Sequence, residues 1–427
     1  MSNDVDRVAR TIERLDRLDR LADLGRHTGE EGTTRPGLSV AEQSACELVG
    51  AWMEEEGLVV SWDGAGNLFG RLPGSDGSAA EIWTGSHLDT VPNGGRFDGV
   101  LGVVVSLEAV SALRGTGHGP TLAVTVFRYE EGWRFGGGCF GSRAITGDLR
   151  PDELETVDAQ GVSVREALDA LGFEGPTAAR SLPGCVIEVH VEQGPVLEAR
   201  GVPHAVVTAI AGIGGFIVTF SGASGHAGTL PLSHRRDAFL AAADFALDLR
   251  RTALSISDAV ATIGDVRIPG GAQNVVPGLT AVSVDVRAPT SEGVHRLADA
   301  VQRLAREAAR RNGCSADVET RWLTEPVEMN DRVRAALHRA AEELAVEAVD
   351  LPSGAGHDAG IFAARGVPTG MLFVRSLNGG VSHRPDELTD PTDVGTAIAV
   401  LTGTLAHLSG ARSDHHPKNS VSSGLEL

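Results

Sequence analysis

Long hydrophobic runs are missing from this 427-residue chain. No stretch is long and apolar enough to span a membrane. Residues 1–25 alternate charged side chains with Leu, Ile and Val at helical spacing, and they contain no apolar signal-peptide core. These absences predict a soluble, cytoplasmic protein that has no membrane partner.

Cysteine and basic residues are both scarce. Cys46, Cys139, Cys185 and Cys314 are scattered and form no CxxC pair, which argues against a disulfide framework and suits reduced thiols in the cytosol. The 37 Lys and Arg residues are outnumbered by 57 Asp and Glu residues. The resulting formal net charge of −20 argues against nucleic acid or an anionic membrane as the main partner.

The rest of the composition is that of an ordinary globular protein, with 42% apolar and 22% charged residues. A chain of this length exceeds what one hydrophobic core usually accommodates, so we expect two domains. In the first half, helical and strand patterns alternate, which predicts an α/β fold with a mixed, mostly parallel sheet. The helices are predicted at 39–58 and 99–115, and the strands at 66–74, 81–91, 121–127 and 185–192.

The pattern changes after residue 210. A strand, a helix, two strands, a helix and a strand follow one another, which is the βαββαβ order of a ferredoxin-like unit. We therefore predict an inserted domain at 211–325, with 1–210 and 326–412 forming one discontinuous catalytic domain. The tail, 413–427, is polar and is predicted to be disordered. The helices of the insertion are predicted at 235–253 and 291–313, and its later strands at 259–268, 280–288 and 315–323.

The first segment with candidate chemistry is GSHLDTVPNGGRFDGVLGV, residues 85–103. A predicted strand ends at His87, Asp89 lies two residues on and on the same face, and Asp98 precedes a helix. Imidazole nitrogens and carboxylate oxygens bind Zn²⁺, Mn²⁺ or Co²⁺, and a carboxylate such as Asp89 can orient a ligating histidine. The alternative is that Asp98 caps the helix and His87 is a surface histidine.

Other histidines and acids also stand at predicted strand ends. They are Glu130 and Glu131 after the strand TLAVTVF, His190 in EVHVEQG, and His383 in the polar loop GGVSHRPDE. Open parallel sheets bind ligands outside the carboxyl ends of their strands. Each residue alone is more simply explained by ordinary hydrogen bonding, but together they favour a single metal site.

Motifs along nearly the whole chain resemble those of the dinuclear metallopeptidase and amidohydrolase superfamily. Within it, the sequence is most similar to the branch of N-carbamoyl-L-amino acid hydrolases, β-ureidopropionases, and allantoate and ureidoglycolate amidohydrolases. The motifs are GSHLDTVPNGGRFDG, EEGWRF, GSRAITG, EVHVEQGPVLE, SGHAGT, NVVP, VDVRAP, SGAGHDA and SHRPDE. The histidine in HVEQG indicates this branch, because peptidase and deacylase relatives usually have a carboxylate at that position.

The resemblance implies two divalent metal ions per subunit, which would be Zn²⁺, Mn²⁺, Co²⁺ or Ni²⁺. One ion would be held by His87, Asp98 and His190, and the other by Asp98, Glu131 and His383. Asp98 would then bridge the two ions. Glu130 would be the general base, and Asp89 would orient His87.

The resemblance also implies how substrate is bound. The inserted domain would be a lid and the dimerisation domain of a homodimer, and His226 in SGHAGT would stabilise the oxyanion across the dimer interface. Asn274 and Arg287 would bind the substrate carboxylate, although Arg287 would equally suit a surface salt bridge. Gln193 would form a hydrogen bond with the ureido group of the substrate.

The implied reaction is cleavage of the ureido C–N bond of an N-carbamoyl-L-amino acid, which gives the amino acid, carbon dioxide and ammonia. Allantoate, ureidoglycolate, an N-acyl amino acid or a dipeptide are alternative substrates. A catalytically inactive binding or scaffold protein is disfavoured, because every ligand position and the base are present. Tyr129, Trp133 and Arg375 depart from the family pattern and leave the substrate open. His357 and Asp358 are interpreted as structural residues near the site.

Overall fold

The computed structural model describes residues 16–179 and 181–411. These residues divide into two compact units. The first unit comprises 16–207, 329–350 and 357–411 apart from residue 180, and the second comprises 208–328 and 351–356. The tail that the sequence predicts to be disordered, 413–427, lies outside the described residues.

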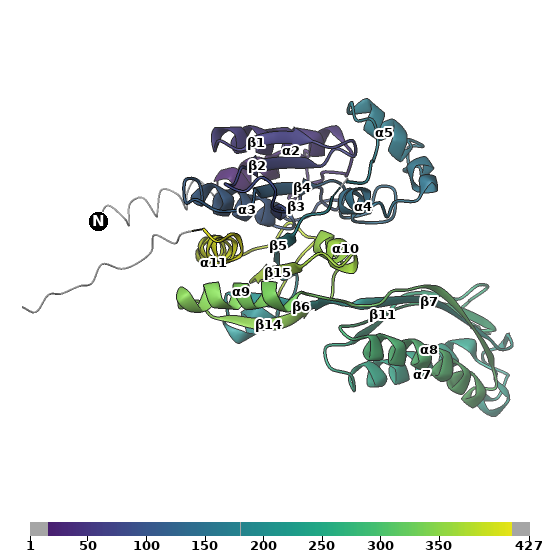
Figure 1. Ribbon diagram of the computed structural model, residues 1–427. Helices are drawn as coiled ribbons and strands as arrows, with labels where there is room; N and C mark the ends of the chain where they lie inside the picture. The colour runs from purple at the N-terminus through teal and green to yellow at the C-terminus, as the bar shows by residue number, and fades with distance from the viewer. Residues whose placement is uncertain (1–15, 180, 412–427) are drawn as a thin grey trace, which may run out of the picture. The chain divides into compact units, whose positions relative to one another are not determined.

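The first unit contains a mixed sheet with the strand order β1-β2-β4-β3-β5-β15-β6 (Figure 1). Its four central strands, β4, β3, β5 and β15, are parallel, and the strands on either side join in antiparallel pairs. This parallel centre confirms the predicted fold class. The strands are β1 (Val59–Trp62), β2 (Leu68–Leu72), β3 (Ile82–His87), β4 (Leu122–Phe127), β5 (Cys185–Val191), β6 (His204–Ile210), β14 (Ala348–Ser353) and β15 (Thr369–Val374).

Helices cover both faces of this sheet, so β3, β4, β5 and β15 are buried along their whole length. On one face lie α2 (Val40–Glu55), α3 (Val100–Ala112), α9 (Asp331–Glu343) and α11 (Pro391–Ser409). On the other face lie α4 (Phe140–Thr146) and α10 (Asp358–Ala364). Shorter helices occupy the connections, namely η1 (Pro151–Glu155), α5 (Val164–Ala170) and α6 (Val196–Arg200).

The second unit has a four-stranded antiparallel sheet in the order β12-β7-β11-β9. Its sheet alternates buried and exposed positions, as in β11, where Val282, Val284 and Val286 face the core under α7 and α8. The chain order β7-α7-β9-β11-α8-β12 is a βαββαβ arrangement. The elements are β7 (Gly212–Ser221), β8 (Gly225–His226), η2 (Leu232–His234), α7 (Ala238–Ala253), β9 (Val260–Arg267), β10 (Val275–Val276), β11 (Leu279–Ala288), α8 (Ser291–Arg311), β12 (Ser315–Leu323) and β13 (Val327–Glu328).

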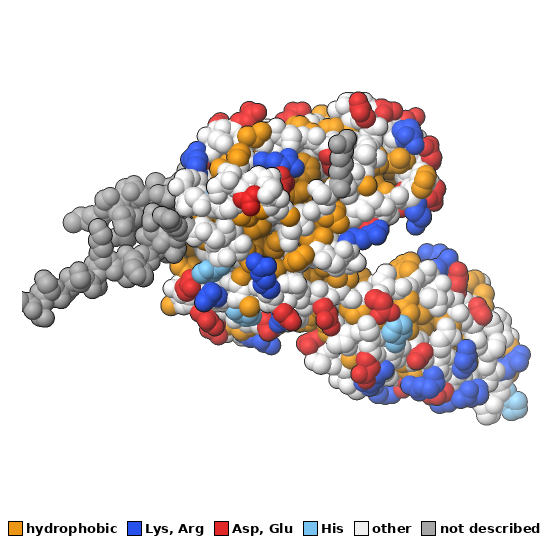
Figure 2. All heavy atoms as spheres, viewed as in Figure 1, with side chains coloured by type: hydrophobic (Ala, Val, Ile, Leu, Met, Phe, Trp, Pro, Cys, Tyr) orange, Lys and Arg blue, Asp and Glu red, His pale blue; other side chains and the backbone are white. Residues whose placement is uncertain are grey.

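The surface of the second unit carries acidic and basic side chains close together over its helices (Figure 2). Several of them pair, for example Arg303 with Glu307 and Arg311 with Asp248. Within the described part of the chain, no helix combines the length and the apolar character that crossing a membrane requires.

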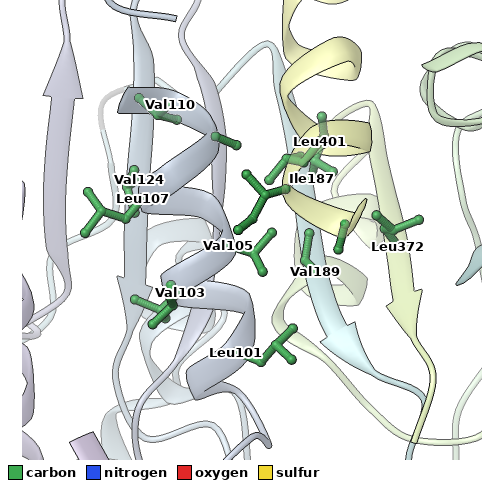
Figure 3. Packing of buried hydrophobic residues seen from close by; sticks show 14 of the residues in the cluster. Leu101, Val103, Val105, Leu107, Val110, Val124, Ile187, Val189, Leu372 and Leu401 are labelled. Carbon is green, nitrogen blue, oxygen red and sulfur yellow. The ribbon is translucent and has the colours of Figure 1, made fainter. Parts of the chain in front are cut away.

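Helix α3 is buried on nearly every side, which explains why its sequence is apolar all round rather than amphipathic. It packs between the parallel strands and α11. In Figure 3, Val103 and Leu107 point to the side of Val124 in β4, and Val105 points to the side of Val189 in β5. Each such side chain contributes about 1.5–3 kcal/mol when it is fully buried. This packing fixes the start of α3, where Asp98 lies.

Gly102 lets α3 approach β5 closely. A Cβ atom at this position would overlap the carbonyl oxygen of Val189, and it would lie 2.8 Å from Cβ of Ser86. A backbone carbonyl in a buried strand has no room to move away. The close approach therefore requires glycine at position 102, although glycine otherwise weakens helices.

We expect Gly102→Ala to lower the free energy of unfolding of the first unit by about 2–3 kcal/mol, because overpacking against backbone is not relieved by a rotamer change. Gly395→Ala in α11 is the matched control, since nothing lies within 4 Å of a Cβ placed there. That control should be neutral or stabilising by up to about 1 kcal/mol. Urea unfolding followed by circular dichroism measures both. Equal effects of the two substitutions would contradict the close contact.

Candidate active site

The predicted site residues of the first unit gather at the carboxyl ends of the parallel strands. His87 is the last residue of β3, and His190 is the penultimate residue of β5. Strand β4 ends at Phe127, so Glu130 follows it in a loop rather than ending the strand. The reason is that the chain turns at Tyr129, which has a φ of 53°. His383 lies in the loop after β15.

Two groups of side chains offer ligand atoms within 4.8 Å of one another. They are His87, Asp98 and His190, and Asp98, Glu131 and His383. The Asp98 Oδ1 atom lies 3.1 Å from His190 Nε2 and 3.5 Å from His87 Nε2. The Asp98 Oδ2 atom lies 3.2 Å from His383 Nε2, which is 3.5 Å from Glu131 Oε2. The structure thus brings together all five residues that the sequence proposes as metal ligands.

The alternative for Asp98, a helix cap, does not agree with the structure. Gly99 is the N-cap of α3, and no side chain caps that end of the helix. The carboxylate of Asp98 instead faces the three imidazole rings. His87 is likewise buried and is not a surface histidine.

The histidine rings have defined tautomers. His190 Nδ1 donates to the carbonyl oxygen of Val191 at 2.9 Å, and His87 Nδ1 donates to the carbonyl oxygen of Asp89 at 3.1 Å. A neutral ring that donates from Nδ1 has a lone pair on Nε2. The two Nε2 atoms face each other at 3.5 Å. Two opposed lone pairs repel unless a cation lies between or beside them.

The carboxylate of Asp89 holds the backbone of the two adjacent glutamates and lies beside His87. Its Oδ1 accepts the backbone N–H of Glu130 at 2.9 Å, and its Oδ2 accepts that of Glu131 at 3.1 Å. Asp89 Oδ1 also lies 3.4 Å from His87 Nδ1. The carboxylate of Asp89 is therefore satisfied by backbone donors, and it fixes the loop from which both glutamates project.

The pKa shifts show that the site favours additional positive charge. Burial raises the pKa of Glu131 to about 7, and the neighbouring carboxylate of Asp98 adds to this rise. Burial also raises the pKa of Glu130 well above its ordinary value. Burial acts on Asp98 in the same direction, but when the three imidazoles carry a proton on Nε2, in place of a metal ion, their hydrogen bonds hold the pKa of Asp98 well below its ordinary value. The hydrogen bond to Asp98 raises the pKa of His383 to about 9.

The donor set fits divalent metal ions. Bonds of about 2.0–2.1 Å to a tetrahedral ion separate its ligand atoms by about 3.3–3.4 Å, and the 3.1–3.5 Å contacts around Asp98 match this spacing. Glu131 Oε1 is buried and accepts no hydrogen bond from any described residue. Neutral imidazoles, carboxylates and such an unsatisfied oxygen are what a pair of divalent ions requires.

Glu130 belongs to neither ligand group. Its carboxylate is nearly buried, and its Oε2 lies 3.9 Å from His87 Nε2. The thiol of Cys139 donates to Glu130 Oε1 at 3.7 Å. A buried carboxylate with few donors, beside the ligands but outside both groups, suits proton transfer better than metal binding.

Gln193 lies against the proposed bridging ligand. Its Nε2 donates to Asp98 Oδ2 at 2.8 Å, and this assignment of the amide follows because the carboxylate can only accept. Gln193 Oε1 is left buried with no hydrogen-bond donor among the described residues. Its backbone has a φ of 55°, another uncommon conformation at the site.

Sequence reasoning missed two buried acids that support the ligands. Glu188, two residues before His190 on β5, accepts Ser86 Oγ at 2.9 Å and the backbone N–H of Ala359 at 2.8 Å. Glu387 accepts the backbone N–H groups of Phe97 and Asp98. The available signal was their place in the motifs EVHVEQGPVLE and SHRPDE, but a motif does not show which donors an acid faces.

Three predicted substrate residues belong to the second unit. His226 Nδ1 accepts the N–H groups of Gly228 at 3.0 Å and Thr229 at 3.2 Å, so the neutral ring carries its proton on the exposed Nε2. Asn274 is exposed, and its carbonyl accepts the N–H of Ala227. Their roles stay predictions.

Arg287 forms the salt bridge that was the alternative to its proposed role. Its Nε donates to Asp285 Oδ1 at 2.8 Å, and its Nη2 donates to Asp285 Oδ2 at 3.2 Å. Its Nη1 donates to the carbonyl oxygen of Gly354 at 2.7 Å. The guanidinium has five N–H groups, so further donors remain for a ligand.

The residues that depart from the family pattern have different surroundings. Tyr129 is buried, and its hydroxyl accepts the N–H of Phe135 at 2.7 Å, which shapes the loop around the glutamates. Arg375 forms an ion pair with Asp393 at 2.8 Å. Trp133 is 39% exposed, and its Nε1 donates to the carbonyl oxygen of Thr90 at 2.7 Å. Of these three, Trp133 alone offers an exposed aromatic ring.

His357 and Asp358 lie beside the ligands. The ring of His357 is 4.5 Å from that of His190 between centroids. Asp358 Oδ1 accepts the hydroxyl of Ser142 at 2.5 Å, and burial raises the pKa of Asp358 to about 8. Both residues are buried, and neither belongs to the two ligand groups.

Comparison with known proteins agrees with this geometry. A family model described as peptidase family M20/M25/M40 matches residues 83–407. The chain belongs to this family. Members of the M20 family generally bind divalent metal ions, in agreement with the two ligand groups. Membership also makes the chain a metal-dependent hydrolase.

Similar proteins cover almost the same length. An N-carbamoyl-L-amino acid amidohydrolase of Geobacillus stearothermophilus is 38% identical over 88% of this chain and 94% of its own length. An allantoate amidohydrolase of Escherichia coli (strain K12) is 36% identical over 84% of this chain and 88% of its own length. A solved structure of a hydantoinase/carbamoylase family amidase from Burkholderia multivorans is 31% identical, with a TM-score of 0.88 over 93% of this chain and 98% of that one.

The geometry separates the roles of the two glutamates. We expect Glu130→Gln to lower hydrolytic turnover by about 100-fold or more while metal content stays unchanged, because a general base contributes about 10²–10⁴-fold. Glu131→Gln should instead lower metal content. Mass spectrometry of the dialysed proteins measures metal content, and an activity assay measures turnover. Loss of metal in Glu130→Gln alone would show that the two roles are reversed.

Proposed function

We propose that the chain is a two-metal amidohydrolase of N-carbamoyl-L-amino acids. The reaction cleaves the C–N bond between the ureido carbonyl and the amino acid nitrogen, and it yields the free amino acid, carbon dioxide and ammonia. The observation that carries the proposal is the buried, unsatisfied Oε1 of Gln193 beside the two ligand groups. The printed functions of the similar proteins support the same chemistry.

The ligand roles remain as the sequence proposed them. His87, Asp98 and His190 would hold one ion, and Asp98, Glu131 and His383 would hold the other. When bound, such ions supply Lewis acidity at the ureido carbonyl and lower the pKa of the attacking water. We infer Zn²⁺, Mn²⁺, Co²⁺ or Ni²⁺, because imidazole and carboxylate donors suit these metals.

Proton transfer would fall to Glu130. Burial raises the pKa of Glu130 above its ordinary value, which makes its carboxylate a stronger base toward water, and it would return the proton taken from water to the leaving amine. Asp89 holds the backbone of Glu130 during this exchange. His226 would donate its Nε2–H to the developing oxyanion, and the two backbone donors on Nδ1 keep it in the tautomer that can do so.

Gln193 favours a ureido group over an acyl group. A buried acceptor without a donor costs about 1–3 kcal/mol. The terminal NH₂ of a carbamoyl group would donate to Oε1 and remove this cost, whereas an acetyl or formyl group has no donor at that position. Asn274 and Arg287 would bind the substrate carboxylate. Trp133 is the exposed ring that we expect to contact the rest of the substrate.

Allantoate and ureidoglycolate are a second candidate class of substrate. They also carry a terminal carbamoyl NH₂, so Gln193 does not distinguish them from N-carbamoyl amino acids. The allantoate amidohydrolase among the similar proteins supports this alternative. A cytoplasmic location is proposed with either substrate, because all four cysteines are free thiols.

A homodimer is supported by an apolar stripe along α7 and its C-cap residue, Leu254. Leu240, Leu247 and Leu254 are spaced by seven residues and are 49%, 53% and 73% exposed. Residues seven apart lie on one side of a helix, so the stripe would pack against its own copy about a twofold axis. His226 lies in the same unit, and in a dimer it would serve the site of the partner subunit.

The substrate is tested by incubating the metal-reconstituted protein with N-carbamoyl-L-amino acids, allantoate, ureidoglycolate and N-acyl-L-amino acids. We expect ammonia release from the ureido substrates at a higher kcat/KM than amine release from the N-acyl series, because Gln193 accepts the carbamoyl NH₂. Ammonia from allantoate or ureidoglycolate alone would favour the second class. Release of amine from an N-acyl substrate, without ammonia from any ureido compound, would refute the proposal.

The role of Gln193 can be separated from its contact with Asp98. In Gln193→Ala, kcat/KM should fall about 10–100-fold more for an N-carbamoyl amino acid than for the N-formyl derivative of the same amino acid. The loss of the contact between Gln193 and Asp98 affects the hydrolysis of both substrates equally. Only the carbamoyl substrate also loses a hydrogen-bond acceptor, Gln193 Oε1. An equal loss of kcat/KM for both substrates would show that Gln193 Oε1 does not recognise the carbamoyl group.

The dimer is tested with Leu247→Glu, which places a charge at the centre of the α7 stripe. We expect light scattering to show the mass halved relative to the unsubstituted protein, because burying an unpaired carboxylate is unfavourable. Leu344→Glu, at an exposed leucine of the first unit, is the matched control and should leave the mass unchanged. A monomeric unsubstituted protein would rule out this interface.

A further inference from the structure

The loop that carries His383 has little regular structure of its own. It runs from the end of β15 at Val374 to the start of α11 at Pro391. His383 has a φ of 59°, and its side chain is 49% exposed. A non-glycine residue keeps such a backbone conformation only where its surroundings hold it. The position of the His383 ligand atom therefore depends on contacts made elsewhere in this loop.

Glu387 supplies these contacts. Its Oε2 accepts the backbone N–H of Phe97 at 2.8 Å and that of Asp98 at 3.1 Å. Its Oε1 lies 2.9 Å from the hydroxyl of Ser382, which donates to it. Glu387 is only 4% exposed. One carboxylate thus ties the segment before α3 to the residue that precedes His383.

The segment before α3 is shaped to receive this carboxylate. A Cβ atom at Gly95 would overlap Oε2 of Glu387 and would lie 2.5 Å from its Cβ. Only glycine therefore leaves room for Glu387 beside the backbone of Phe97 and Asp98. The hydroxyl of Ser382 also lies 2.9 Å from Asp98 Oδ2, so its single proton is shared between the two carboxylates.

The contacts of Glu387 affect the ligand group of Asp98, Glu131 and His383 more than the group of His87, Asp98 and His190. His87 and His190 are carried by β3 and β5, in the centre of the buried sheet. His383 has no such support, and Asp98 reaches it across two loops. A shift between the loops would change the spacing of Asp98 and His383 while leaving His87 and His190 in place.

We propose that Glu387 is a positioning residue that sets the distance between Asp98 and His383 and thereby the affinity for the ion held by Asp98, Glu131 and His383. This role rests on the two-ion site of the proposed function. Burying a carboxylate is costly unless donors satisfy it, and here two of the three donors are the N–H groups of Phe97 and Asp98. Partners that hold ligands in place commonly change metal affinity by about 10–100-fold when they are removed.

The test is titration of the metal-free full chain with Co²⁺, followed by calorimetry and by visible absorption. Unsubstituted protein should bind two ions. In Glu387→Ala, we expect one ion to bind as before and the other to bind at least about tenfold more weakly. Glu387→Gln should restore binding of both, because its amide oxygen can accept the two backbone N–H groups while its NH₂ donates to Ser382.

The geometric role is separated from charge and from general stability by two further variants. Glu387→Asp keeps the charge but withdraws the carboxylate, so it should lose affinity like Glu387→Ala, and it serves if the alanine variant does not fold. Glu166→Ala removes a carboxylate that likewise accepts a backbone N–H and a serine hydroxyl, from Ser163, away from the ligands. This control should bind both ions normally.

Full binding of both ions by Glu387→Ala or by Glu387→Asp would overturn the proposal. Equal losses in Glu387→Gln and Glu387→Ala would also overturn it, because charge rather than geometry would then decide. An unsubstituted protein that binds fewer than two ions would refute the two-ion site and this role together. The binding measurements use no substrate, so failure of the N-carbamoyl substrate in the activity panel would leave the role of Glu387 intact.

Discussion

The contact on which the rest of the site depends is that of the Asp98 carboxylate with three imidazole rings. One oxygen faces His87 and His190, and the other faces His383. Because one oxygen faces each ligand group, Asp98 links the two groups. Asp98 itself is held by its position just before α3, a helix that is buried on nearly every side. The core of the first unit therefore fixes the centre of the site.

The adjacent glutamates are tolerated for the same electrostatic reason. Two buried carboxylates repel each other, and burial raises the pKa of both. Asp89 adds a third carboxylate, but it is occupied by the backbone N–H groups of Glu130 and Glu131. The remaining negative charge faces the histidines, where cations would neutralise it. The same set of carboxylates therefore holds the loop in place and leaves negative charge that a metal ion would neutralise.

The long periodic elements were predictable because their patterns are local. The strand predicted at 315–323 matches β12 residue for residue, and the helix predicted at 291–313 differs from α8 by two residues at its end. Short elements such as α4 and α5 were not predicted, because seven residues carry too little periodicity. Strand β4 ends at Phe127, two residues before Tyr129 adopts a left-handed conformation, and a buried aromatic cluster stabilises that turn. The residues of that cluster come from segments far apart in the sequence, so the local pattern did not predict the turn.

The sequence by itself determined which residue types stand at the strand ends, and in what order. Those types, with the motifs around them, were enough to name the five proposed ligands and the base. Only the tertiary structure decided which atoms face one another: the tautomers of His87 and His190, the free oxygen of Gln193, and the link from Glu387 to Asp98. The physical reason is that hydrogen bonds act over about 3 Å and depend on exact atomic positions. Those positions are set by the fold, both for near neighbours such as His190 and Val191 and for Glu387 and Asp98, which are 289 residues apart.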